Sequence, residues 1–177
     1  GAKEQNQGIA EVKIDGELYQ FPMKYEEFAA KGWNLDGISS EEQLSPNSYG
    51  LVSMKYGRIS ASVTFMNFGI NTKPLSECYV AGIDLDEYYM QDQMSFELPN
   101  GIVYGVSTQE DVENAYGPAS DIYESEYYTE LTYEAGDFYS RIEIYISPET
   151  NKVNRVNIRS LTTPEDLEED EVSEEVP

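Results

Sequence analysis

The stretch Gly-Val-Ser-Thr-Gln-Glu-Asp-Val-Glu-Asn-Ala-Tyr-Gly-Pro, residues 105–118, predicts one short helix with a signal at each end. Ser107 is expected at the N-cap, with Glu110 three residues later to complete a capping box. Gly117-Pro118 is the stop, because glycine tolerates a left-handed backbone and proline cannot continue a helix. The apolar stripe of this helix is narrow, so the helix must pack on another element to be stable.

Strand signals occur on both sides of this helix. Apolar and polar side chains alternate in several segments, which is typical of half-buried strands. The strands expected on this basis are residues 59–65, 79–85, 127–133, 140–146 and 154–160. Asp15-Gly16 predicts a type I′ hairpin near the start of the chain, and residues 21–31 predict a first helix that ends at Gly32.

The same order of elements occurs twice, since in each half a short helix ending at glycine precedes antiparallel strands. This order predicts an α+β fold of two related helix-plus-antiparallel-sheet halves, with the helices packed on one face of a curved sheet. The expected parts are a polar linker (1–10), a first repeat (11–92), a second repeat (93–162) and a disordered acidic tail (163–177).

Composition excludes several classes of site. The 177 residues carry 34 acids against 11 bases, net charge −23, which makes nucleic acid an improbable partner. The sequence has no histidine and one cysteine, Cys78, so a Ser-His-Asp or Cys-His site, a His-containing zinc site and an internal disulfide are impossible. Cys78 is expected to be buried and inert, and no cofactor is predicted.

Location is predicted from composition. No run of eighteen apolar residues exists, so no membrane insertion is expected. The polar segment Ala2–Gly8, the abundant tyrosine and the low lysine content favour an exported bacterial envelope protein, secreted or anchored at the cell surface by a lipid before residue 1.

Gly105-Val-Ser107, Val112 and Gly117-Pro118, followed by three antiparallel strands, carry a family resemblance. Residues 102–161 resemble the small helix-and-sheet module of the β-lactamase inhibitor protein family and of outer-membrane assembly lipoproteins. The earlier half of the chain resembles this module more weakly. The resemblance implies a non-enzymatic exported protein, often lipid-anchored, whose sheet face binds another protein. The matched residues are structural, so no functional residue is carried across.

Three of the four arginines fall on the outward face of the last two expected strands. Arginine and tyrosine are enriched where protein interfaces bind. The predicted binding residues are therefore Arg141, Arg155, Arg159, Tyr139, Tyr145 and Asn157. A purely structural alternative stays open, in which these arginines pair across strands with Glu143 and Glu130 on a solvated face.

Other chemistries compete with protein binding. Fifteen tyrosines suggest glycan binding, and paired carboxylates suggest a hydrolase; the pairs are Glu26/Glu27, Glu41/Glu42, Glu124/Glu126 and Asp84/Asp86/Glu87. The segment from Asp84 begins like a calcium loop, but it lacks glycine at the sixth position and has Ser95 in place of the bidentate glutamate. An EF-hand is excluded, and weak calcium binding stays open. The sequence predicts a non-catalytic protein-binding module, with a cell-envelope glycan-binding protein or hydrolase as the alternative.

Overall fold

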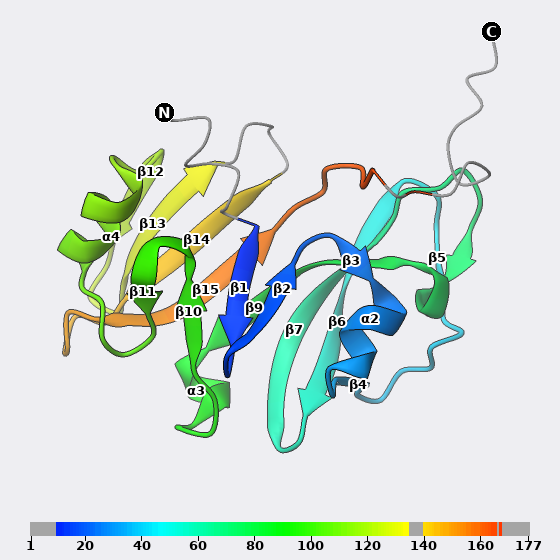
Figure 1. Cartoon of the computed structure of the whole chain (residues 1–177), viewed down its shortest axis with the longest axis horizontal. Helices are drawn as coiled ribbons and strands as arrows, with labels where there is room; N and C mark the ends of the chain where they lie inside the picture. Colours follow the sequence, from blue (N-terminus) through cyan, green and yellow to red (C-terminus); the bar gives the residue numbers. More distant parts are fainter. Residues whose placement is uncertain (1–9, 135–139, 166, 168–177) are drawn as a thin grey trace, which may run out of the picture.

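The computed structural model describes residues 10–134, 140–165 and 167 (Figure 1). The described residues exclude almost all of the predicted N-terminal linker and most of the predicted acidic tail. The predicted binding residue Tyr139 also lies outside them. The described part consists of a nine-stranded sheet, a four-stranded sheet and a two-stranded sheet.

The large sheet is antiparallel throughout and runs across the whole molecule in Figure 1. Its strand order is β12 (Asp121–Glu124), β13 (Thr129–Glu134), β14 (Arg141–Ile146), β15 (Val153–Arg159), β9 (Tyr79–Asp86), β7 (Ile59–Asn67), β6 (Ser48–Tyr56) and β4 (Asn34–Leu35). The short β3 (Met23–Lys24) also pairs with β9. The pairing of β15 with β9 is one place where the two predicted halves meet.

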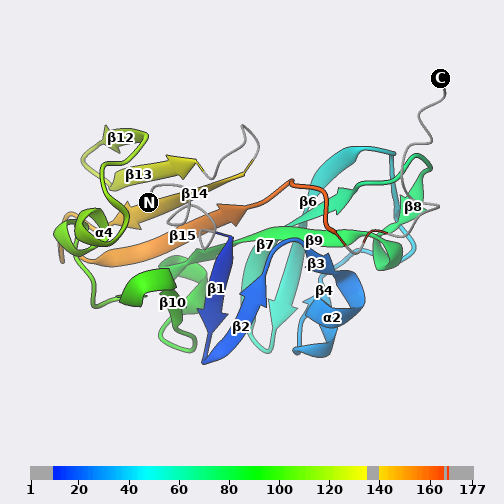
Figure 2. The same cartoon turned by 45° about the horizontal axis from the view of Figure 1, so that its top comes forward.

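A second sheet lies against one face of the large one, between α4 and α2 (Figures 1 and 2). Its order is β11 (Ile102–Val103), β10 (Phe96–Leu98), β1 (Glu11–Ile14) and β2 (Glu17–Gln20). The third sheet pairs β5 (Gln43–Leu44) with β8 (Lys73–Pro74). The helices are α2 (Tyr25–Ala30), α3 (Glu87–Met90) and α4 (Gln109–Tyr116), with 3-10 turns η1 (Leu75–Glu77) and η2 (Pro99–Gly101).

The hydrophobic core lies between the two sheets. Strand alternation places one apolar row across six strands of the large sheet; its members are Tyr133, Ile142, Ile158, Ile83, Val63 and Val52. Trp33 is one of the fully buried residues of this core. Its ring stacks on Phe28, and its Nε1–H donates a hydrogen bond of 3.0 Å to the Tyr19 hydroxyl. The indole is therefore buried with its polar group satisfied.

The α+β prediction is wrong. Of the described residues, 47% are in strands and 16% are helical, and the three α-helices are short. The predicted Asp15-Gly16 hairpin is confirmed, and the reason for the difference is that β10 pairs with β1 of this hairpin while β11 pairs with β10. A second sheet thus supplies much of the cover that the sequence assigned to helices alone. The division into repeats 11–92 and 93–162 stays a prediction.

The helix boundaries also differ from those expected. The first helix begins at Tyr25, because the two residues before it pair with β9 as a strand. The N-cap of α4 is Thr108 and the box is closed by Asp111, whose carboxylate accepts from the Thr108 N–H at 2.9 Å. Ser107 is instead buried and its Oγ accepts from the Val103 N–H at 2.8 Å, which fixes the approach to the helix.

Candidate functional site

Among the described residues, none forms a second layer over the central strands on one face of the large sheet, and we call this the open face (Figure 2). Cross-strand register arranges its side chains in rows. One row consists of Glu134, Arg141, Arg159, Gly82, Thr64 and Leu51. The next consists of Thr132, Glu143, Asn157, Asp84, Ser62 and Ser53. The sheet thus brings together side chains more than a hundred residues apart in sequence.

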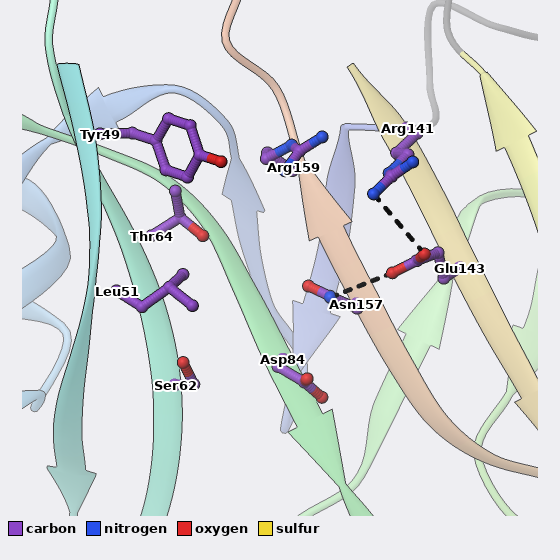
Figure 3. Close-up of a pocket in the computed structure, with 9 residues that line it drawn as sticks. All are labelled: Tyr49, Leu51, Ser62, Thr64, Asp84, Arg141, Glu143, Asn157 and Arg159. Atoms are coloured by element: carbon purple, nitrogen blue, oxygen red, sulfur yellow. Dashed lines mark hydrogen bonds and ion pairs between the residues drawn. The ribbon is translucent and has the colours of Figure 1, made fainter. Parts of the chain in front are cut away.

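A depression of about 160 Å³ lies where these two rows cross β14, β15, β9, β7 and β6 (Figure 3). The residues that line it are Tyr49, Leu51, Ser62, Thr64, Asp84, Arg141, Glu143, Asn157 and Arg159. Gly82 stands between Arg159 and Thr64 in the first row, so no side chain fills that position. Basic, acidic, hydroxyl and apolar groups therefore surround one hollow.

Arg141 and Arg159 form the basic end of the depression. They lie directly opposite each other on β14 and β15. Arg159 extends over the ring of Tyr49, with 5.7 Å between the guanidinium carbon and the ring centroid. The Arg141 side chain is 40% exposed, and its Nη2 is 3.9 Å from a Glu143 oxygen, which is too long for a strong hydrogen bond.

Glu143 is the acidic group between these arginines and the rest of the second row. Its carboxylate accepts a hydrogen bond of 3.1 Å from the Asn157 amide. Burial raises the pKa of Glu143, although Arg141 pulls it the other way. Glu143 is therefore easier to protonate than an ordinary glutamate.

Arg155 differs from the other two arginines. Its guanidinium binds both oxygens of Asp84, at 3.0 and 2.7 Å, and comes within 3.7 Å of Asp86. The hydrogen bonds to Asp84 raise the pKa of Arg155. This bidentate pair joins β15 to β9, so Arg155 is a structural residue at the border of the depression.

Tyr145 is also on the open face, but it is buried rather than available to a ligand. Arg155 lies over its ring at 4.4 Å, and Tyr128 packs edge-on against it at 5.2 Å. Burial and a hydrogen bond with Glu130 raise the pKa of Tyr145 far above its ordinary value. The structure thus groups five of the six predicted binding residues on one face and brings three of them, Arg141, Asn157 and Arg159, to the depression.

The structural alternative for the arginines is realised in part. Arg141 is near Glu143, as that alternative expects, but Arg155 pairs with Asp84 and Asp86 rather than with Glu130. Sequence reasoning did not place Tyr49, Leu51 and Thr64 at the site. Strand parity could have found them only together with the knowledge that β15 pairs with β9.

The remaining candidate sites have simpler structural explanations. Asp86 accepts from the Tyr88 N–H as the N-cap of α3, and Asp84 holds Arg155. Within the described residues, no group of three or more His, Cys, Asp or Glu side chains is arranged to hold a metal ion. Cys78 is buried, and its thiol contacts the Pro74 carbonyl at 3.3 Å. None of the described helices is long and apolar enough to span a membrane.

Comparison of the chain with protein-family models, curated proteins and solved structures finds no match. The resemblance to the β-lactamase inhibitor and assembly-lipoprotein modules therefore stays a prediction.

Proposed function

We propose that this chain is a non-catalytic, extracytoplasmic module that binds a partner protein through its open face, with the depression at the centre of the contact. The observation that carries the proposal is the grouping of two arginines with exposed apolar side chains around one hollow. Tyr49 and Leu51 are 51% and 70% exposed beside Arg141 and Arg159. Tyrosine and arginine are enriched among the residues that dominate protein interfaces.

The size and shape of the open face suit a protein better than a buried small molecule. The depression, of about 160 Å³, is smaller than the pockets that enclose drug-sized ligands. Its floor is a pleated sheet, whose backbone groups are already paired by β7, β9 and β15. Partner side chains inserted into such a hollow gain orientation from the arginines and area from the apolar residues.

A photo-crosslinking experiment tests this function. A benzophenone amino acid at Ser53, on the open face of β6, should give a discrete crosslinked product in cells that make the protein. The same amino acid at Glu110, exposed on α4, should not give that product. The Ser53 product should disappear in an Arg141→Gln/Arg159→Gln variant.

The matched control removes the same charge elsewhere. Lys13 and Lys152 are exposed on the second sheet and in the β14–β15 turn, so a Lys13→Gln/Lys152→Gln variant should keep the product. A Ser53 product that is unchanged in the arginine variant, or equal products from both labelled positions, would refute the proposal.

A second candidate is glycan binding or hydrolysis, and one observation favours it. Glu143 and Asp84 lie in one row on either side of Asn157, two strand spacings apart, so their Cα atoms are about 9–10 Å from each other. Glu143 has a raised pKa, while both oxygens of Asp84 accept hydrogen bonds from Arg155. Inverting glycosidases use an acid and a carboxylate whose carboxyl groups are about 6.5–9.5 Å apart. Binding on a glycan array or turnover in a glycosidase panel, lost in Glu143→Gln, would favour this candidate.

A further inference from the structure

The strand β12 ends the large sheet near α4, and its outer edge is open (Figures 1 and 2). In the described part of the chain, β12 pairs with β13 and with no other strand. All four of its residues are exposed. An open edge of this kind is a place where an extended segment of another protein can add a strand to the sheet.

The hydrogen bonds of the β12–β13 hairpin show which backbone groups of β12 point outward. The Ser125 N–H donates to the Tyr128 carbonyl at 2.9 Å, so these residues form a hydrogen-bonded pair. Hydrogen-bonded and non-hydrogen-bonded pairs alternate along an antiparallel ladder. The backbone of Tyr123, two residues earlier, is therefore bonded to β13, whereas the N–H and C=O groups of Ile122 and Glu124 face the open edge.

The apolar row that crosses the sheet at Ile122 is incomplete at this edge. Register aligns Ile122 with four side chains of the next strands, each no more than 1% exposed: Leu131, Ile144, Val156 and Leu85. Ile122 itself is 45% exposed. An apolar side chain directly opposite it on an added strand would bury this surface.

The charge of this edge selects among the possible occupants. Asp121 and Glu124 are the two ends of β12, and Glu126 follows in the turn; within the described residues, none of them takes part in an ion pair. Residues 74–140 contain no lysine or arginine. A second copy would place like charges against one another, and each copy has a net charge of −23, so self-pairing is unfavourable. A basic segment has the complementary charge.

We propose that β12 is a second binding surface, which adds an antiparallel strand of a partner protein in which lysine or arginine alternates with valine or isoleucine. The pairing is antiparallel because this arrangement is the more stable per residue and is used throughout the large sheet. The apolar side chains of the added strand lie on the core side, opposite Ile122. Its basic side chains lie on the other side, near Asp121 and the exposed ring of Tyr123. This inference goes beyond the proposed function and does not depend on the depression.

A capped peptide and the full chain test this pairing by amide hydrogen exchange and NMR. In the free protein, the Ile122 and Glu124 amides should exchange about tenfold faster than the Tyr123 amide or more, because only Tyr123 is bonded to β13. The peptide Lys-Val-Lys-Val-Lys-Val-Lys should slow the exchange of the first two amides about tenfold and change that of Tyr123 less. A peptide with glutamate in place of every lysine should have no effect.

Backbone methylation of the peptide tests the register. In the proposed pairing the valines lie opposite Ile122 and Glu124, so the valine N–H groups donate to β12. N-methylation of the valines removes these donors and should weaken binding about tenfold or more. N-methylation of the lysines is the matched control, because the lysine N–H groups point away from β12. It should change the affinity by less than about threefold.

Charge variants of the protein test the chemistry of the partner. Asp121→Asn/Glu124→Gln should weaken binding of the lysine–valine peptide about tenfold. Glu41→Gln/Glu42→Gln removes the same charge from exposed positions before β5, and it should weaken binding by less than about twofold. Raising the NaCl concentration should reduce the difference between the two variants.

The inference is overturned if the lysine–valine peptide leaves the two amides unchanged, if the glutamate peptide acts equally, or if lysine methylation weakens binding as much as valine methylation. Slow exchange of the Ile122 and Glu124 amides in the protein alone also overturns it. Slowing that depends on protein concentration would identify a second copy as the occupant, and slowing at every concentration would identify another segment of the chain.

The result is independent of the crosslinking experiment. The Arg141→Gln/Arg159→Gln variant should bind the lysine–valine peptide as the wild type does. Failure of the peptide to bind would therefore leave the open-face proposal intact. Loss of the Ser53 crosslink as a test of that proposal would likewise leave the β12 surface intact.

Discussion

At the scale of single residues, the three arginines of the open face have different roles. Arg155 forms two short hydrogen bonds to Asp84, whose side chain is 18% exposed, whereas Arg141 has one ion-pair distance of 3.9 Å. A partly buried, charge-assisted pair contributes more than an exposed pair does. Arg155 therefore stabilises the sheet, and Arg141 is available to a partner.

Alanine substitutions should separate these roles. Arg155→Ala is expected to lower the free energy of unfolding by about 1.5–3 kcal/mol, because Asp84 and Asp86 lose their common counter-charge. Arg141→Ala should lower it by less than about 0.5 kcal/mol. Urea denaturation with an unchanged m-value would measure both. Equal losses for the two variants would contradict this distinction.

At the scale of the strand, Gly82 determines how closely β9 approaches β15. A Cβ at Gly82 would lie 2.0 Å from the Ile158 carbonyl oxygen and 3.0 Å from the Arg159 Cα. Backbone atoms cannot move aside as the end of a flexible side chain can, so only glycine fits between these strands. This close contact is also where the β7–β9 register shifts, between Thr64 and Phe65.

The same substitution at two glycines tests this contact. Gly82→Ala is expected to cost about 3 kcal/mol or more, since β9 and β15 must separate in the middle of the large sheet. Gly50→Ala on β6 is the control, because its Cβ would meet only a Leu44 methyl at an ordinary 3.6 Å. It should change stability by less than about 1 kcal/mol, and it could be stabilising through the unfolded state. Thermal unfolding of both variants measures the difference, and similar Tm values would refute the explanation.

Some strands could be predicted from the sequence and others could not. The alternation of Ile142, Ile144 and Ile146 correctly predicted β14, since all three are buried. The nine-residue β6 was missed, because exposed Leu51 precedes buried Val52 and breaks the simple alternation. Short strands such as β10 and β11 are too brief to show a period, and their partners lie far away in the sequence.

At the scale of the whole molecule, the grouping of the site follows from topology that the sequence alone does not contain. The alternation of side chains along a strand was enough to place Arg141, Arg159 and Asn157 on one face, because successive side chains of a strand point to opposite faces. It could not place Tyr49 or Leu51 opposite them, because the order β15-β9-β7-β6 depends on long-range pairing. The composition excluded histidine and disulfide chemistry at the site, since these need residues that the chain lacks.

The net charge of −23 makes the stability of the whole molecule dependent on salt. Excess negative charge destabilises the compact state through self-repulsion, and salt screens that repulsion. Raising NaCl from about 10 mM to about 0.5 M should therefore raise Tm by several degrees, and KCl at equal concentration should act alike. Scanning calorimetry measures the shift. A Tm that falls as salt rises would show that local ion pairs such as Arg155–Asp84 outweigh the overall repulsion.

The second sheet has a consequence for how the chain is made. Its hairpin β1–β2 pairs with β10, and Asp15 accepts a hydrogen bond from the Ser95 N–H, eighty residues further along the chain. Synthesis proceeds from the N-terminus at about 5–20 residues per second, so roughly 4–18 s separate the appearance of Ile14 from that of Val103. For that interval the first strands to be made have no partner beyond each other. A nascent chain that stops before Ser95 cannot close its core. The second sheet is complete only after β10 and β11 have been synthesised.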